Sequence, residues 1–314
     1  MADDLSVLAP LDVAKGIAFP TCVNPNNIPA HMSPPTPEDE SNLTLAHGDV
    51  VNFMLGAQVD GFPAVVGETF IVGESVESPV TGAKADLMHA AWNASEAAIR
   101  TLTKGRRTYG VTAVVDKVAK NFGTSAVQSM ISNTFEKNVL YGAKEIILNP
   151  TKEHKNQTST YEFEQNDVWG LDILISTSAD GKVRNSNYKT SLYKLTGSKY
   201  ALKLRTSQQA LRLFKPKAAD MFPVNIKNFE DPKKMRLGLI ECSRHHVTLP
   251  YDIMEGKPGD YIAQFFTTVA IGPNGLVKYT HPSFDGSLYT TDKKVEDEEL
   301  QQLLAMPLHE PATI

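Results

Sequence analysis

The sequence predicts an α+β fold in which helices cover a large sheet. Residues 49–72 and 168–177 have the alternating pattern of apolar, β-branched and aromatic residues that is typical of strands. Residues 84–102 and 112–122 carry apolar side chains at the spacing of amphipathic helices. The chain has 314 residues, of which 41% are hydrophobic, so it can bury a large core in one domain or in two.

The first of these strand segments is predicted to be a hairpin, because Asp60-Gly61 is a strong signal for a two-residue turn. In this register Gly56 faces Val65, and Met54 is the diagonal neighbour of Val65 on the same face of the sheet. The side chains of Met54 and Val65 are therefore expected to share one pocket.

The remaining elements follow in chain order. Residues 16–20 are predicted to form a strand, 22–41 a loop rich in Pro and Asn, 188–195 and 200–204 two strand-like stretches, 206–214 a helix capped by Thr206 or Ser207, 231–243 a helix with Pro232 in its first turn, 261–271 a strand and 297–306 a short acidic helix.

Cysteine usage and hydropathy indicate the compartment. Cys22 and Cys242 are far apart in sequence, so they predict neither a disulfide framework nor a CxxC metal site, and a reduced compartment follows. No apolar run reaches the length of a membrane span, and the acidic start lacks the pattern of a signal peptide. The sequence therefore predicts a soluble intracellular protein without a membrane partner.

The net charge of -5 conceals a strong asymmetry. Residues 182–217 contain ten Lys or Arg and no acid, whereas the rest of the chain carries 21 basic and 36 acidic residues. A block this one-sided predicts a surface for a polyanion, and a solvated lysine-rich face is the alternative. The ten cations are Lys182, Arg184, Lys189, Lys194, Lys199, Lys203, Arg205, Arg212, Lys215 and Lys217.

A set of ordered phrases connects the chain to a known family: KGIAFPTC at 15–22, VDGFP at 59–63, TGAKAD at 81–86, LNPTK at 148–152, LRTSQ at 204–208 and IAQFF at 262–266. They resemble the pita-bread superfamily of methionine aminopeptidases and creatinases. The similarity is strongest to the proliferation-associated, curved-DNA-binding family, whose members are non-peptidase homologues of type-two methionine aminopeptidases.

The resemblance implies a division of the chain. A pita-bread domain would comprise residues 14–179 and 259–306, and a small, helical, basic subdomain would be inserted at 180–258. Residues 1–13 do not match the start of the family pattern, and 307–314 would be a C-terminal tail.

The resemblance also locates the positions that bind two metal ions in the peptidases: Met54, Val65, Asn133, Asp172 and Phe266. Only Asp172 remains a carboxylate. Two-metal hydrolysis requires several carboxylates and usually a histidine. The sequence therefore predicts no catalytic residue, no metal and no cofactor. With apolar neighbours, Asp172 is expected to be partly buried with a raised pKa, or hydrogen-bonded to backbone.

His31 lies where the peptidases keep a histidine near the substrate, so a vestigial substrate cleft would contain His31 and Asp172. Three functions remain open. The resemblance favours a non-catalytic protein that binds the ribosome, ribosomal RNA or DNA through the basic insert. It would act in ribosome biogenesis, translation or growth regulation, with regulatory proteins as further partners, in the cytoplasm and the nucleus, including the nucleolus. The alternatives are a peptide- or protein-binding scaffold that uses the vestigial cleft, and an active metalloaminopeptidase.

Overall fold

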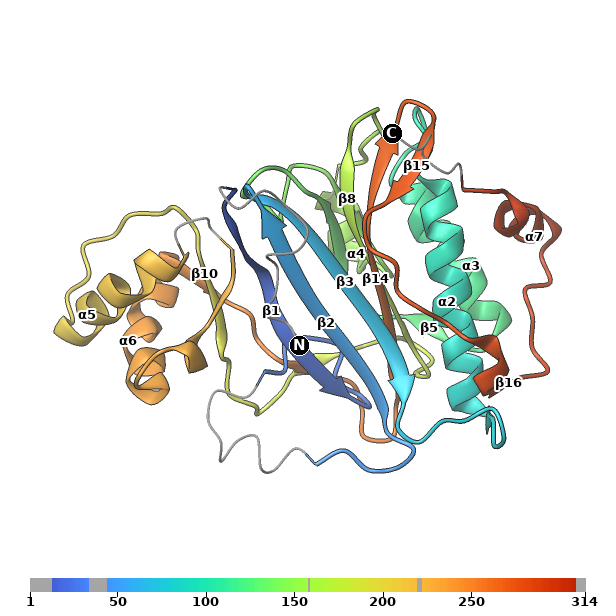
Figure 1. Cartoon of the computed structure of the whole chain (residues 1–314), viewed down its shortest axis with the longest axis horizontal. Coiled ribbons are helices and arrows are strands. Elements are labelled where there is room, and N and C mark those ends of the chain that lie inside the picture. Colours follow the sequence, from blue (N-terminus) through green and yellow to red (C-terminus); the bar gives the residue numbers. More distant parts are fainter. Residues whose placement is uncertain (1–12, 34–43, 158, 219–221, 309–314) are drawn as a thin grey trace.

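The computed structural model describes residues 13–33, 44–157, 159–218 and 222–308. Most of the predicted segment 1–13, part of the predicted Pro- and Asn-rich loop and the end of the predicted tail therefore lie outside the described residues. Figure 1 shows a broad, twisted sheet with helices along one side and a smaller lobe of helices and short strands at the far end.

The main sheet is antiparallel and is built from segments at both ends of the chain. Its strands are β1 (Lys15–Pro25), β2 (Val50–Val59), β3 (Phe62–Ile71), β5 (Ser125–Ala126), β6 (Ile131–Thr134), β7 (Glu145–Ile147), β8 (Val168–Ser176), β14 (Ile262–Gly272) and β15 (Gly275–Lys278). They follow the order β1-β2-β3-β14-β8-β6-β7, with β15 paired to β14 and β5 paired to β8. β1 is longer than the predicted strand because its irregular pairing with β2 continues to Pro25.

The β2–β3 hairpin has the predicted register. Asp60 and Gly61 form its two-residue loop with φ values of 51° and 81°, as a type I′ turn requires. Gly56 pairs with Val65, and Met54 lies two residues before Gly56 on the same face. Met54 and Val65 are buried in one apolar cluster, so the prediction that they share a pocket is confirmed.

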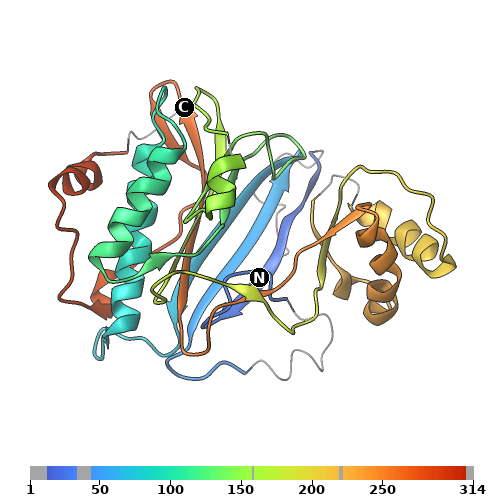
Figure 2. The same ribbon diagram turned by 180° about the vertical axis from the view of Figure 1, so that it is seen from behind.

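Two helices, α2 (Ala83–Thr101) and α3 (Tyr109–Asn121), cover one face of the sheet and confirm the predicted helices (Figure 2). The buried side of α2 is rich in alanine, so the helix lies close to β8 and β14. Trp92 is half-buried and meets Phe265 of β14 edge to face, with ring centroids 5.3 Å apart. The acidic helix α7 (Glu298–Ala305), capped by Asp297, packs against α2.

The smaller lobe has its own core. Its elements are β10 (Leu192–Leu195), α5 (Arg205–Phe214), η2 (Lys215–Ala218), β11 (Val224–Asn225), η3 (Ile226–Asn228), α6 (Pro232–Arg244) and β12 (Thr248–Pro250). β10 lies between β11 and β12 in a small sheet, and α5 and α6 pack on it. The core residues include Tyr193, Phe214, Met235, Leu239 and Cys242, so the predicted buried face of α6 is confirmed.

The start of α5 differs from the prediction. Neither Thr206 nor Ser207 caps the helix, because it begins before both, with Leu204 as the N-cap residue and no side-chain cap. Instead, the carboxylate of Glu241 in α6 accepts the backbone N–H groups of Lys203 at 2.8 Å and Leu204 at 3.1 Å. A contact from a distant helix thus replaces the local cap.

The strand-like stretches of the lobe are also shorter than predicted. Of residues 188–195 only 192–195 form a strand, because only these residues find partners in β11 and β12. Residues 200–204 form no strand. The remaining elements are β4 (Val80–Thr81) with β16 (Tyr289–Thr290), β9 (Arg184–Asn185) with β13 (Met254–Glu255), α4 (Lys152–Gln157) and η4 (Gly286–Leu288). In the part of the chain that the structure describes, no helix has the length and apolarity needed to cross a membrane.

Candidate functional site

Four adjacent strands bring the predicted ligand positions together on one face of the sheet. Met54 of β2 pairs with Gly67 of β3, and Gly67 pairs with Phe266 of β14. Phe266 in turn pairs with Asp172 of β8. Residues directly opposite one another on neighbouring strands point to the same face, and so does Val65, two residues from Gly67. The sheet therefore has the geometry of a shared site at these positions.

Asn133 reaches the same face from β6. It pairs with Gly170, which lies two residues from Asp172 along β8, so Asn133 and Asp172 point to the same side. The Asn133 side chain is half-buried. An amide oxygen is a poorer ligand for a transition metal than an imidazole nitrogen.

A buried apolar cluster occupies this face. Its members are Ala18, Phe19, Cys22, Met54, Val65, Phe135, Leu140, Leu192, Phe222, Tyr251 and Phe266. Leu192, Phe222 and Tyr251 lie within the predicted insert 180–258, and the others lie within the predicted pita-bread domain. The rings of Phe135 and Phe266 stack with centroids 6.3 Å apart. The insert therefore closes the region in which the sequence places a vestigial cleft. We call this set of residues the apolar plug.

Asp172 lies beside the apolar plug, and it is only 8% exposed. Its Oδ1 accepts a hydrogen bond of 2.7 Å from Nε2 of Gln264, which also lies 3.8 Å from Sδ of Met54. Burial raises the pKa of Asp172 to about 7, although the bond from Gln264 acts in the opposite direction. The expected burial of Asp172 is confirmed, and this burial is the cause of the raised pKa. The hydrogen-bond partner of the carboxylate, however, is the side chain of Gln264, which the sequence analysis did not predict.

The donor atoms at this face do not fit a pair of metal ions. Three of the five positions are apolar or thioether side chains, and the only carboxylate already has an amide partner. Among the residues that the structure describes, no group of three or more His, Cys, Asp or Glu is placed to hold a metal. The Cys22 thiol of the apolar plug is neutral, because burial raises its pKa to about 12.

His31 borders the apolar plug from the other side. Its half-buried ring lies 5.1 Å from the Tyr251 ring and 6.1 Å from the Phe19 ring, measured between centroids. Nδ1 lies 3.2 Å from the backbone oxygen of Asp252, and burial lowers the pKa of the imidazole. Within the described ranges, no hydrogen bond joins His31 to Asp172. The two residues therefore do not form an acid–base pair.

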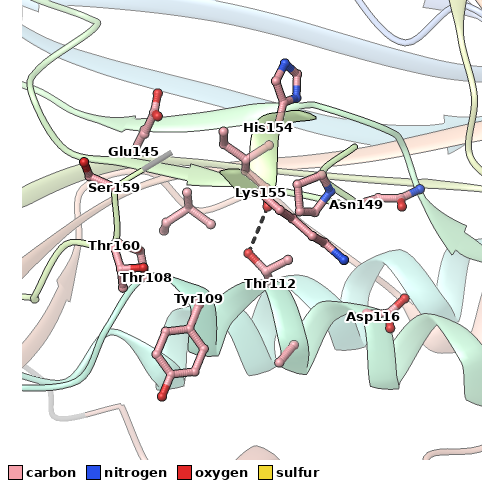
Figure 3. A pocket seen from close by; sticks show the side chains of 14 residues that line it. Thr108, Tyr109, Thr112, Asp116, Glu145, Asn149, His154, Lys155, Ser159 and Thr160 are labelled. Carbon is pink, nitrogen blue, oxygen red and sulfur yellow. Dashed lines mark hydrogen bonds between the residues drawn. The ribbon is translucent and has the colours of Figure 1, made fainter. Parts of the chain in front are cut away.

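A separate pocket of about 440 Å³ lies between α3, the end of β7 and α4 (Figure 3). Its lining includes Tyr109, Thr112, Asp116, Glu145 and Lys155. Thr112 donates to the backbone oxygen of Ile147, and Asp116 pairs with Lys120 at 2.6 Å. Sequence reasoning missed this pocket because its residues come from three separate segments without a shared motif. The side chains of Asp116, Glu145 and Lys155 in this pocket do not indicate a particular reaction or ligand.

The structure divides the ten cations of the basic run into two groups. Four of them have partners within the fold. Lys182 pairs with Asp180 at 3.3 Å and Arg184 with Glu255 at 3.1 Å. Lys194 is half-buried with Nζ 4.0 Å from the Tyr141 ring centroid, and burial lowers its pKa. Lys217 donates to the backbone of Asn228 and lies over the Phe229 ring.

The other six cations are exposed, and in the described part of the chain their side chains form no ion pair. They are Lys189, Lys199, Lys203, Arg205, Arg212 and Lys215. We call them the exposed basic set. Beside it, Tyr200 stacks on His245 with ring centroids 3.7 Å apart, and both residues are exposed. Tyr193 lies in the core of the insert, so only some of the tyrosines between the lysines are available for stacking.

Both the sequence and the fold are similar to those of known proteins. The pattern of metallopeptidase family M24 matches residues 6–171. The Curved DNA-binding protein of Schizosaccharomyces pombe is 39% identical, over 95% of this chain and 77% of that protein. Proliferation-associated protein A of Dictyostelium discoideum is 35% identical, over 95% and 75%. A solved structure of a thermophilic Arx1 superposes with a TM-score of 0.87 at 28% identity, over 96% and 85%.

Proposed function

Because the chain belongs to metallopeptidase family M24 and has its pita-bread fold, with curved-DNA-binding and proliferation-associated proteins as relatives, we propose that it is a non-catalytic member of that family. Its function is to bind a polyanion, namely ribosomal RNA on the ribosome or DNA, through the exposed basic set. It acts in the cytoplasm and the nucleus, in ribosome biogenesis, translation or growth regulation.

The absence of peptidase activity is supported by the chemistry of the former ligand positions. Hydrolysis by two metal ions requires carboxylates that hold both ions and ionise a bridging water. Met54, Val65 and Phe266 supply no such oxygen, and they are packed against one another in the apolar plug. No step of peptide hydrolysis can be derived from this arrangement.

The observation that carries polyanion binding is the exposed basic set itself. Six cations lie on the surface of the insert without a partner among the described residues, and no acid occurs from 189 to 215. Their potential extends over about 8 Å, the Debye length at physiological salt. One relative is named a curved DNA-binding protein, which agrees with this class of ligand.

A peptide-binding scaffold built on the vestigial cleft is the second reading, and the apolar plug argues against it. A peptide would have to displace Leu192, Phe222 and Tyr251 from buried contacts before it could reach Asp172. Exposing three large apolar side chains costs about 2 kcal/mol for each of them. We therefore place the binding function on the insert surface.

Reversing three members of the exposed basic set is expected to abolish co-sedimentation with ribosomes at physiological salt. The variant is Lys199→Glu, Lys203→Glu and Arg212→Glu, all at exposed positions, so its melting temperature is expected to stay close to that of the parent protein. If each cation contacts one phosphate of single-stranded RNA, the slope of log affinity against log salt becomes less steep by about 2. Fluorescence anisotropy across a salt series measures this slope.

The matched control reverses Lys104, Arg106 and Arg107, which form an exposed basic loop on the main domain. It changes the net charge by the same amount, and it is expected to keep most of the binding. If the insert variant still co-sediments, or if the loop variant loses binding to the same extent, the insert is not the polyanion-binding surface.

The purified protein is expected to contain no stoichiometric transition metal and to release no methionine from a peptide that begins with Met-Ala. The reason is the loss of ligand atoms at Met54, Val65, Asn133 and Phe266. Elemental analysis and an amino-acid release assay test this, with an active methionine aminopeptidase as positive control. A content of about two metals per chain together with turnover would contradict it.

A further inference from the structure

Helix α6 presents an apolar stripe to solvent. Leu237 is 67% exposed and Ile240 is 44% exposed, and they lie three residues apart on one face. Lys233 precedes this pair by one turn and Arg244 follows it by one turn, and both are exposed. The opposite face of the helix is buried in the core of the insert. α6 therefore has two apolar faces. One is buried in the core of the insert, and the other is exposed to solvent.

Helix α5 widens this apolar surface. The two helices run antiparallel, since Gly238 meets Ala210 whereas Sγ of Cys242 lies 3.9 Å from the backbone oxygen of Ser207. They are very close together, because a Cβ at Gly238 would lie 2.3 Å from the Cβ of Ala210. Leu213, three residues after Ala210, is 49% exposed, and Leu237 directly precedes Gly238. Both leucines thus flank the line of contact between the helices. The pair lies at the outer end of the insert (Figure 1).

Along the two helices the exposed charges are cationic, and the exposed acids Glu230 and Asp231 lie just before the start of α6. In the two helices the only acid is Glu241, which is buried and accepts the backbone N–H groups at the start of α5. Lys233, Lys234 and Arg244 line the α6 side and are exposed. The surface therefore has an apolar centre and a cationic rim, which is the layout of a protein interface.

The apolar centre and the cationic rim determine which kind of partner can bind this surface. A second copy of the chain does not fit, because antiparallel contact of two α6 helices sets Lys233 against Arg244, and parallel contact sets each cation against itself. A nucleic acid backbone neutralises the rim but leaves the leucines without apolar partners. An acidic amphipathic helix can pack its apolar face against the centre and place its carboxylates beside the cations of the rim.

We propose that the exposed surface of α5 and α6 binds an amphipathic helix of a partner protein, with apolar residues at its centre and carboxylates toward both ends. Lys233 and Arg244 are eleven positions apart, which corresponds to roughly 16 Å along a helix. The partner helix packs across the exposed faces of the two helices and completes a three-helix bundle. Arg205 and Arg212 of the exposed basic set also lie on α5, but the site is defined by the apolar side chains of Leu213, Leu237 and Ile240, so its recognition does not depend on polyanion binding.

The test uses the full chain with isotope-labelled methyl groups and a synthetic helical peptide of about four turns. The peptide repeats the spacing of the α6 face, with glutamate, leucine, leucine and glutamate at the positions that correspond to Lys233, Leu237, Ile240 and Arg244. Titration is expected to shift the methyl signals of Leu213, Leu237 and Ile240 in the NMR spectrum. A control peptide with lysine in place of both glutamates is expected to bind at least about tenfold more weakly, a difference of about 1.4 kcal/mol.

A charge-swapped variant makes the test specific. Lys233→Glu with Arg244→Glu is expected to invert the preference, so that the lysine peptide binds better than the glutamate peptide. Both positions are exposed, and an unchanged melting temperature verifies the fold. Equal shifts with both peptides, or no shift at millimolar peptide, overturn the inference. So does a result in which a short single-stranded RNA shifts these three methyl groups and the glutamate peptide does not.

Discussion

Replacing Met54 and Val65 by aspartate is expected to destabilise the protein by several kcal/mol and to leave it without peptidase activity. The two side chains are 4% and 1% exposed and lie in the apolar plug beside Asp172. Two further carboxylates at this place must be buried without cationic partners or must bind protons, and either costs a large part of the folding free energy. Activity does not return, because Asn133 and Phe266 still supply no suitable ligand.

The measurement is thermal unfolding of the double variant, with and without added cobalt or manganese. Leu55→Asp with Val66→Asp is the matched control, since these residues pair on the other face of the same hairpin and are more exposed. The control is expected to lose clearly less stability. An unchanged melting temperature of the Met54 and Val65 variant would show that the face of the sheet is not sealed as the structure indicates.

Replacing Asp172 by asparagine is expected to stabilise the protein at alkaline pH. An aspartate in an unfolded chain titrates at about 3.9, whereas burial raises the pKa of Asp172 in the folded protein to about 7. The folded state therefore holds this proton more tightly than the unfolded state. Its contribution to stability is present in full below pH 4, declines as the pH rises, and is lost above pH 7.

Asparagine remains neutral at every pH and keeps an oxygen for the bond from Gln264. The variant is therefore expected to match the parent near pH 4 and to exceed its unfolding free energy by about 4 kcal/mol at pH 8, at about 1.4 kcal/mol for each pKa unit. Urea unfolding at a series of pH values measures the difference, with Asp116→Asn at an exposed position as control. A variant that is less stable than the parent at pH 8 would contradict the assignment of Asp172 as a buried, neutral acid.

Local chemistry determines the parts of the fold that the sequence predicted well. Asp60-Gly61 sets the hairpin register, and that register puts Met54 and Val65 in contact. Likewise, Asp231 accepts the backbone N–H of Lys234, so the start of α6 depends on residues that adjoin it in sequence. In such cases the interacting groups are within a few residues of one another, and a pattern is sufficient to find them.

The parts that the sequence did not predict depend on contacts between distant segments. The cap of α5 comes from Glu241, more than thirty residues later. The apolar plug includes Leu192, Phe222 and Tyr251, whose spacing in the sequence carries no motif. The basic run likewise has uniform composition, yet Lys194 turns inward over Tyr141, on the main domain. Only tertiary structure distinguishes such a residue from its exposed neighbours.

The order of strands in the main sheet has a consequence for how the chain folds during synthesis. β14 lies between β3 and β8, but it is the last of these three strands in the sequence. Until Ile262–Gly272 has left the ribosome, the facing edges of β3 and β8 have no partner, and such edges promote aggregation. The insert, which precedes β14, is complete before the sheet can close. The helices of the insert therefore leave the ribosome before the strand that joins the two halves of the main sheet.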